Sequence, residues 1–238
     1  MKLISWNCNM AFRKKADLLL VHQPDIMIIQ ECEHLDKLPF ISKYGEGIDC
    51  LWFGKNLHKG MAVFAFGKYK LKVCNHHREE FRMVVPIEVN DGQDQFLLFA
   101  IWANNPDDKD GQYVTQVWKA IRHYAEDLKN NKVILAGDFN SNSIWDRPRR
   151  EGNHSDVVTF LENLGIHSVY HTKLTQVQGK ESHPTFYLYR HLEKPYHIDY
   201  FFVSETLLNQ LDSVSVGSHE NWKGLSDHVP IFVEFDSV

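Results

Sequence analysis

The sequence lacks the features that mark several large classes of protein. No run approaches the roughly 20 apolar residues of a membrane-spanning helix, and only two apolar residues separate Met1-Lys2 from Ser5, too few for a signal peptide. No heptad pattern, repeat or low-complexity stretch indicates a coiled coil, a repeat array or a disordered chain. We therefore predict a globular protein of the cytoplasm without a membrane partner.

Cysteine is scarce and the charge is nearly balanced. Cys8, Cys32, Cys50 and Cys74 are the only cysteines among 238 residues and form no CxxC pair. We therefore expect reduced, partly buried thiols rather than a zinc site or a disulfide scaffold. The 31 acidic residues outnumber the 26 basic ones, for a net charge of −5. A protein that coats nucleic acid non-specifically is not expected, although a local basic groove is compatible with this charge.

The order of the apolar segments predicts an α/β domain with much antiparallel sheet. Residues 2–7 and 26–29 have the pattern of buried strands, and a helical stretch at 14–22 lies between them and ends before Pro24. The further strands are expected at 61–66, 83–89, 96–102, 132–136, 186–189, 197–203, 211–216 and 229–235.

Two longer segments have the periodicity of amphipathic helices. Apolar residues recur at helical spacing over 111–129 and again over 156–164, where Gly165 is expected to end the helix. The dipeptide Asp91-Gly92 predicts a hairpin turn between two of the strands. No linker divides the chain, so we expect a single domain over residues 1–238 and a monomer.

Polar side chains interrupt or end the predicted buried strands at several positions. Asp199 lies inside the apolar run HIDYFFV, where an ionised carboxylate is costly unless it is paired. One such carboxylate can be structural, but several at strand ends are typical of a site that is assembled from distant segments. The positions are Asn7, Glu31, Asp138, Asn140, Asp199, Asp227 and His228.

Two of these carboxylates and two amides suit the binding of a metal and a phosphate. Glu31 and Asp227 offer hard oxygen ligands for Mg²⁺, which typically takes one or two carboxylates and keeps waters and phosphate oxygens. The Asn7 and Asn140 amides can hydrogen-bond a ligand or a phosphate without adding negative charge. Asn7 is expected at both the metal and the substrate.

The other three residues suit acid–base chemistry. His228 can donate a hydrogen bond to a phosphoryl oxygen, and Asp199 can hold its tautomer and favour its protonated form. Asp138 can orient or deprotonate an attacking water. The set predicts in-line attack of water on a phosphate ester, with Asp138, Asn140, Asp199 and His228 as catalytic residues.

Five short motifs occur in the order seen in one known superfamily. They are WNCN near the start, QE after the second strand, GDFN, HIDYFFV and SDHVP. The chain thereby resembles the endonuclease/exonuclease/phosphatase superfamily, which includes exonuclease III, apurinic-site endonucleases, DNase I and inositol-phosphate phosphatases. The resemblance covers residues 2–233. It implies a DNase I-like four-layer α/β sandwich, in which two packed, mainly antiparallel β-sheets are flanked by helices. It also implies a divalent metal between the sheets, Mg²⁺ with Mn²⁺ as a substitute, and points to the same seven residues.

One position departs from the superfamily pattern. Where a central strand ends close to the phosphate, the superfamily usually has Tyr or His, whereas the segment AIWANNP places Trp102 there. An indole donates one hydrogen bond but neither accepts one nor titrates. Trp102 is therefore either a substrate contact or a core residue, and Asn104 is the candidate to take over the polar role.

The loop after GDFN is the main cue to the substrate. An aromatic residue lies among three arginines there, and such a combination suits the phosphates and bases of a nucleic acid. A solvated surface loop is the alternative. A histidine of the segment SHPTF is a further candidate for the pocket. These candidate substrate contacts are Trp145, Arg147, Arg149, Arg150 and His183.

The observations together predict a Mg²⁺-dependent phosphodiesterase that hydrolyses nucleic acid, an exo- or endonuclease for which DNA is favoured over RNA. A phosphatase or phosphodiesterase for a small phosphorylated molecule is the alternative, which the acidic net charge favours slightly. A catalytically silent binding module is the third reading. It is disfavoured because a silent site would not need carboxylates that repel one another.

Overall fold

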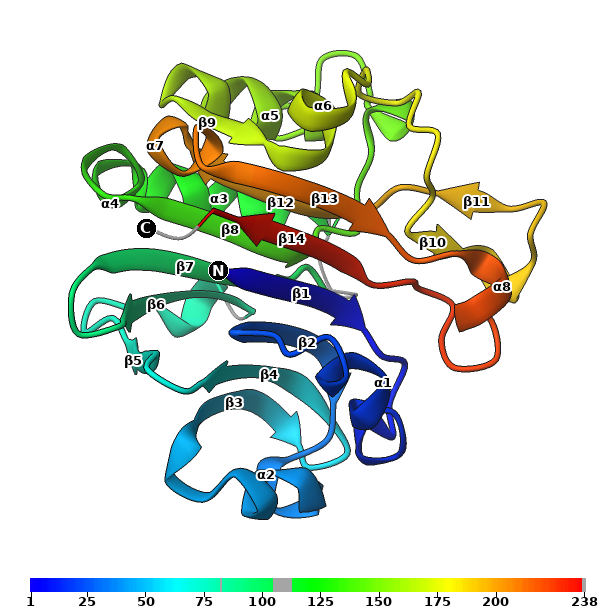
Figure 1. The fold of residues 1–238 in the computed structure, drawn as a ribbon. Helices are drawn as coiled ribbons and strands as arrows, with labels where there is room; N and C mark the ends of the chain where they lie inside the picture. The colour runs from blue at the N-terminus through cyan, green and yellow to red at the C-terminus, as the bar shows by residue number, and fades with distance from the viewer. Residues whose placement is uncertain (82, 105–112, 237–238) are drawn as a thin grey trace.

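The computed structural model describes residues 1–81, 83–104 and 113–236, which form two packed six-stranded β-sheets (Figure 1). The first sheet contains, in spatial order, β13 (Leu211–Val216), β14 (Ile231–Phe235), β1 (Lys2–Asn7), β2 (Ile26–Cys32), β4 (Lys59–Phe66) and β3 (Ile48–Asn56). The second contains β5 (Lys70–Val73), β6 (Val84–Asn90), β7 (Gln95–Trp102), β8 (Val133–Asp138), β12 (Asp199–Ser204) and β9 (Ile166–Ser168). A separate two-stranded hairpin consists of β10 (Phe186–Tyr187) and β11 (Pro195–Tyr196).

Both sheets are mainly antiparallel, as predicted. Within the first sheet only β1 and β2 run parallel among the neighbouring strands described, and within the second only β7 and β8 do. The dipeptide Asp91-Gly92 lies in the turn between β6 and β7, where Gly92 has a φ of 90°. A glycine favours such a positive φ, so the predicted hairpin is confirmed.

A hydrophobic layer fills the space between the sheets because alternate residues of each strand point to the same side. In β2, Ile26 and Ile28 belong to this inner layer, whereas Met27 and Ile29 belong to a cluster on the outer face of the first sheet. The same alternation in β7 and β8 divides the second sheet between the inner layer and an outer cluster.

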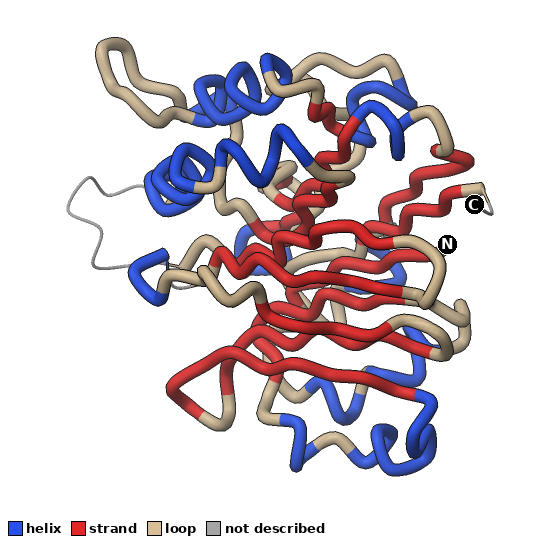
Figure 2. The backbone as a smooth tube through the Cα atoms, turned by 90° about the vertical axis from the view of Figure 1, so that its left-hand side faces the viewer, coloured by secondary structure: helices blue, strands red, loops and turns tan. Residues whose placement is uncertain are grey.

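Helices cover both outer faces, which gives the four layers that the superfamily resemblance implied (Figures 1 and 2). None of the helices described is long and apolar enough to cross a membrane. The α-helices are α1 (Ala16–Leu20), α2 (Pro39–Tyr44), α3 (Val114–His123), α4 (Ala125–Asn130), α5 (His154–Asn163), α6 (Val169–Leu174), α7 (Glu205–Leu208) and α8 (His219–Trp222). The 3₁₀ turns are η1 (Phe12–Lys14), η2 (Leu35–Lys37), η3 (Gly45–Gly47), η4 (Glu79–Phe81), η5 (Ser143–Trp145) and η6 (Leu188–Arg190).

Two predicted helices are divided in the structure. The stretch at 14–22 becomes η1 and the short α1, because Lys15 between them has a ψ of −14° at a φ of −126°. The helix predicted at 111–129 becomes α3 and α4, with a break at Tyr124, and its residues 111–112 lie outside the described part of the chain. Tyr124 is buried and its hydroxyl accepts the Arg78 N–H at 3.0 Å, so a tertiary contact holds it at the break.

Several strand boundaries also differ from the prediction. The strand at 186–189 is limited to β10, because Tyr189 has a φ of 56° and cannot continue the ladder. The last strand begins at Ile231 rather than at 229, directly after Pro230, which has no N–H to donate. The strands β3, β5 and β9 were not individually predicted. All four cysteines are free, as expected, and only Cys50 is partly exposed.

Candidate active site

The candidate site forms where the last residues of several central strands meet. Asp138 ends β8, and the strand register places it beside Trp102 of β7 on one side and Asp199 of β12 on the other. Asn7 ends β1 in the opposite sheet, and its side-chain Nδ2 donates to Asp138 Oδ2 at 3.1 Å. The site therefore joins the two sheets at one end of the sandwich.

A glycine makes the close approach of β7 and β8 possible at this end. Gly137 precedes Asp138 and has a φ of 141°. A Cβ atom at this position would lie 1.8 Å from the carbonyl oxygen of Ile101. The glycine of the GDFN motif thus has a structural role, because only glycine allows the chain to place Asp138 at this position.

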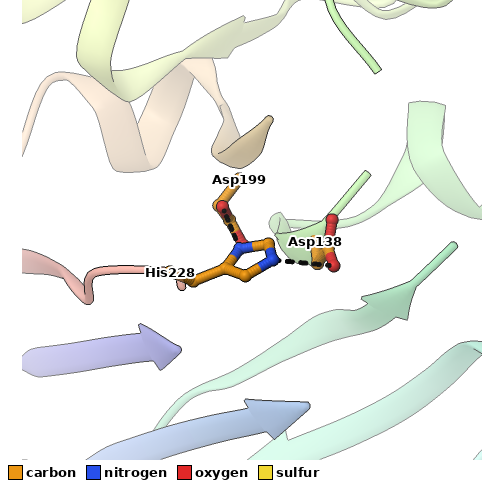
Figure 3. A group of neighbouring side chains, drawn as sticks. All are labelled: Asp138, Asp199 and His228. Atoms are coloured by element: carbon orange, nitrogen blue, oxygen red, sulfur yellow. Dashed lines mark hydrogen bonds and ion pairs between the residues drawn. The ribbon is translucent and has the colours of Figure 1, made fainter. Parts of the chain in front are cut away.

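His228 and Asp199 form a buried pair (Figure 3). The imidazole Nδ1 donates to Asp199 Oδ2 at 2.9 Å, and Nε2 on the other side of the ring lies 4.0 Å from Asp138 Oδ2. Thr185 steadies the start of β12, because its Oγ1 accepts the backbone N–H groups of Ile198 and Asp199 at 3.0 and 3.1 Å. The imidazole is therefore held in one tautomer and one orientation between two carboxylates.

The neighbouring carboxylates favour a protonated His228. Burial by itself would lower the pKa of this imidazole, but the charge and hydrogen bond of Asp199, with smaller effects of Asp138 and Asp227, raise the pKa to about 9. An imidazolium that points Nε2 away from Asp199 can donate a hydrogen bond to an anion.

Asp138 is a fully buried acid, and burial disfavours its ionised form. Burial and the nearby charge of Asp199 raise the pKa of Asp138, and the charge of His228 and two amide partners only partly offset this effect. Asn140 supplies two of the donors, from its backbone N at 2.9 Å and from Nδ2 at 3.2 Å. A carboxyl group with a raised pKa can accept a proton near neutral pH.

Glu31 reaches the site through an irregularity in β2. The register against β4 shifts between Gln30 and Cys32, and Glu31 between them has a φ of 58°, as in a β-bulge. Its Oε2 lies 3.1 Å from Lys59 Nζ, and the same ammonium lies 5.6 Å from the centre of the Trp102 ring. In the structure, Glu31 therefore forms an ion pair with Lys59.

Asp227 lies on the segment before β14, which is fastened to the loop after β1. Asn9 Nδ2 donates to Asp227 Oδ1 at 2.9 Å, and Ser226 Oγ donates to the Asn7 carbonyl at 2.7 Å while it accepts the His228 N–H at 3.0 Å. Lys15 adds a further link, since Nζ donates to the carbonyls of Cys8, Met10 and Leu225 at 2.6 to 2.9 Å. The two loops thus form one unit around the site.

One group of buried side chains has donor atoms close enough together to hold a metal ion. Among the described residues, Asp138, Asp199 and His228 form the one group of three His, Cys, Asp or Glu side chains whose ligand atoms lie within 4.8 Å of one another. Asp199 Oδ1 is buried without a hydrogen-bond partner among these residues. Glu31 and Asp227, the ligands expected from the sequence, are not members of this group.

Trp102 and Asn104 lie at the edge of a groove beside the site. Trp102 is buried in the layer between the sheets, and it also lines this groove together with the half-buried Asn104. Trp102 is therefore a core residue that also borders the groove, and its contact with a substrate stays a prediction.

The arginine loop is only partly directed to solvent. Arg147 and Arg149 are exposed, whereas Arg150 Nη2 turns back and donates to Thr115 Oγ1 on α3. Trp145 is 40% exposed and begins a row of rings that leads to His228. The ring centres are 5.0 Å apart from Trp145 to Tyr196, 6.3 Å from Tyr196 to Phe186 and 4.7 Å from Phe186 to His228.

His183 is exposed but its side chain is turned to Tyr170, whose hydroxyl lies 3.0 Å from Nδ1. Its carbonyl accepts from His197 Nδ1 at 2.7 Å. His183 thus borders a network of buried polar side chains behind the site rather than the group around Asp138.

Sequence reasoning missed the residues that hold the site together. Ser226 and Thr185 stand directly beside the motif residues in SDHVP and SHPTF, so proximity to a motif was an available signal. Asn9 carried no signal, because a lone asparagine in a polar segment is ordinary. Phe186 and Tyr196 could have been noticed only as aromatic residues close to motif segments.

Comparison with known proteins places the fold. The model of a family described as endonuclease-reverse transcriptase matches residues 97–232. No curated protein sequence matches the chain.

The structure is similar to that of the 3′ phosphatase NExo from Neisseria bound to a product DNA hairpin, with a TM-score of 0.69, 20% identity and 100% of both chains covered. An AP endonuclease from Archaeoglobus fulgidus has a TM-score of 0.72, 16% identity and 100% of both chains covered. The endonuclease domain of TRAS1, a telomere-specific non-LTR retrotransposon, has a TM-score of 0.67 and 16% identity, over 99% of this chain and 97% of that one.

Proposed function

This chain belongs to the endonuclease-reverse transcriptase family, and on that premise we propose that it is a metal-dependent phosphodiesterase that hydrolyses nucleic acid, with DNA as the favoured substrate. The observation that carries the proposal is the buried Asp138–His228–Asp199 group, which is linked to Asn7 of the other sheet. Two buried carboxylates around an imidazole are costly for a merely structural role, because burial destabilises charge. The DNA-bound and AP-endonuclease relatives of the same fold support nucleic acid as the substrate.

His228 and Asp138 would divide the acid–base work. The imidazolium, held by Asp199, would donate from Nε2 to a phosphoryl oxygen and so stabilise charge that develops as water attacks. Asp138 would orient this water and accept its proton, for which its raised pKa is suited. Asn7 and Asn140 keep Asp138 in position through three hydrogen bonds and present amides to the substrate.

A divalent cation fits a second set of donors at the site, outside the buried group of Asp138, Asp199 and His228. We propose that the carboxylates of Glu31 and Asp227, with the amide of Asn7, hold Mg²⁺ or Mn²⁺, because these oxygens are hard ligands and Glu31 lies in a position where it already attracts the Lys59 ammonium. When bound, the ion would supply positive charge to the phosphoryl oxygens.

The test is hydrolysis of end-labelled single-stranded DNA, duplex DNA and RNA with Mg²⁺ or Mn²⁺. We expect cleavage that EDTA abolishes, and a loss of about 10³-fold in kcat/KM for Asp138→Asn. Asp212→Asn, which removes an exposed carboxylate on β13, is the matched control and should retain full activity. Cleavage of none of these nucleic acids, with hydrolysis of phosphorylated sugars, nucleotides or inositol phosphates instead, would establish the small-molecule phosphatase.

A further inference from the structure

A groove leads away from the candidate site on the side of Glu31. Its volume is about 930 Å³, and Glu31, Trp102 and Asn140 form its inner end. From there it runs between the ends of β3 and β4 and the segment around η4. The groove is therefore continuous with the place where the scissile phosphate would bind, and whatever occupies it lies next to that phosphate.

Aromatic rings and cations line this groove together. Phe53 and Trp102 extend from the core between the sheets, and the exposed Tyr113 also lines the groove. Lys59 is fixed at the inner end by Glu31 and the Trp102 ring, and the exposed Lys55 lies further out. Such rings bind the faces of unpaired bases, and ammonium groups bind phosphates.

A base-paired duplex does not suit this lining. In a duplex, the faces of the bases are stacked on one another, so the rings of a groove can contact them only after the strand is unstacked at a cost of a few kcal/mol per base. The groove also contains two carboxylates, Glu31 and Glu79, and is not the strongly basic surface that tracks a duplex backbone. Unpaired nucleotides avoid the cost of unstacking and present both faces and phosphates.

The other side of the site is built differently. There the rings of Trp145, Tyr196 and Phe186 form a chain of contacts that ends at His228, in which only Tyr196 and Phe186 are stacked and the other two pairs are tilted. Around the groove, by contrast, no ring–ring contact joins Phe53, Trp102 and Tyr113 among the described residues, and Tyr113 is exposed, whereas Trp102 is buried with Lys59 over its ring. The exposed Tyr113 ring in the groove is therefore open to a base, with no stacked ring of its own on it.

We propose that this groove binds unpaired nucleotides that continue from the scissile phosphate, so that the substrate is a single-stranded nucleic acid or a duplex with a single-stranded end. The proposal rests on the function proposed above. Phe53 and Tyr113 contact base faces, and Lys55 and Lys59 contact the phosphates between them.

The test measures binding and cleavage separately. The probe is a single-stranded DNA 10-mer with 2-aminopurine at successive positions, whose fluorescence falls when the base stacks on a ring. We expect quenching with the Asp138→Asn protein, which binds without cutting. When Tyr113→Ala is added to the Asp138→Asn protein, binding should weaken about tenfold, since each stacked base contributes about 1–3 kcal/mol. Tyr113→Phe in the same background should keep the wild-type affinity. Tyr189→Ala, which removes a ring that is 74% exposed outside the groove, should leave binding unchanged.

The outcomes separate this proposal from the proposed function. Equal affinity for a blunt duplex and the single strand, or an unchanged affinity of Tyr113→Ala, overturns the groove proposal even if DNA is cleaved. Quenching that depends on Tyr113 without cleavage of any nucleic acid supports the groove and overturns the proposed function. Phe53→Leu provides a second variant that keeps an apolar side chain in the core, and it should also weaken binding of the single strand.

Discussion

Two histidines at the same end of the sandwich are almost equally buried, yet their pKa values are shifted in opposite directions. His228 is 5% exposed and donates to Asp199, which contributes to a raised pKa of about 9. His197 is 3% exposed, two residues before Asp199 in the chain, and its Nδ1 donates to a backbone carbonyl. Burial lowers the pKa of His197 to about 4. Burial alone therefore does not determine what a histidine does, because the partner's charge decides which form is stable.

His197 belongs to a buried network that lies behind the candidate site. His171 Nε2 and Asn142 Nδ2 both donate to Glu181, at 3.0 and 3.2 Å, and Asn142 also donates to the His197 carbonyl at 2.9 Å. His154 bridges Ser141 and Gln178. The network fastens the residues after GDFN to the start of β12. Several of the 14 histidines thus have a structural role beside the site rather than in it.

The largest effect is expected when the carboxylate charge that distinguishes the two histidines is removed. In Asp199→Asn, the largest effect that offsets burial is lost, so the pKa of His228 should fall and kcat/KM should fall by about 10³-fold at neutral pH. NMR titration of the His228 ring measures the pKa independently of activity. An unchanged titration of His228 in this variant would contradict the assigned cause.

The second prediction concerns acid stability and has a smaller effect. The folded pKa of His197 lies below the unfolded one, so the unfolded chain binds the extra proton and stability falls as the pH drops from 6.5 towards 4. His197→Gln removes this pH-dependent contribution of the histidine. Between pH 7.5 and 4.5, the free energy of unfolding of the variant should therefore fall by about 2 kcal/mol less than that of the wild type. Urea unfolding at the two pH values provides the measurement. Neutral-pH cleavage should change little, and a loss comparable to that of Asp199→Asn would refute the division between the two histidines.

The smallest effect is expected for the carboxylate of the network. Hydrogen bonds from His171, Gly179 and Asn142 outweigh burial and lower the pKa of Glu181 to about 2, so its contribution to stability is present above pH 4.5 and is lost as the pH falls through 2. Glu181→Gln should lower the free energy of unfolding by about 1 kcal/mol at pH 7. The difference in the free energy of unfolding between this variant and the wild type should shrink as the pH falls. The same urea titrations at lower pH measure it. A difference that stays constant down to pH 2 would show that packing, not charge, is responsible.

Much of the fold was predictable because it depends on local patterns. The strands β1, β6, β7 and β8 agree with the predicted ones to within two residues, since alternation and β-branched content are visible in the sequence. The divided helix at Tyr124 and the short β10 were not predictable, because a distant partner and two left-handed residues, Tyr189 and Arg190, decide them. The register of the strands was also not predictable, as it depends on which distant segments pair.

The sequence by itself determined which polar residues are placed at strand ends, because an acid within an apolar run such as HIDYFFV stands out without any structure. Only the tertiary structure decided which of them meet. It brings Asp138, Asp199 and His228 together with Asn7, pairs Glu31 with Lys59, and turns Arg150 and His183 towards other partners. The physical reason is that hydrophobic periodicity is a local property, whereas a pKa or an ion pair depends on charges that chain folding brings within a few ångströms.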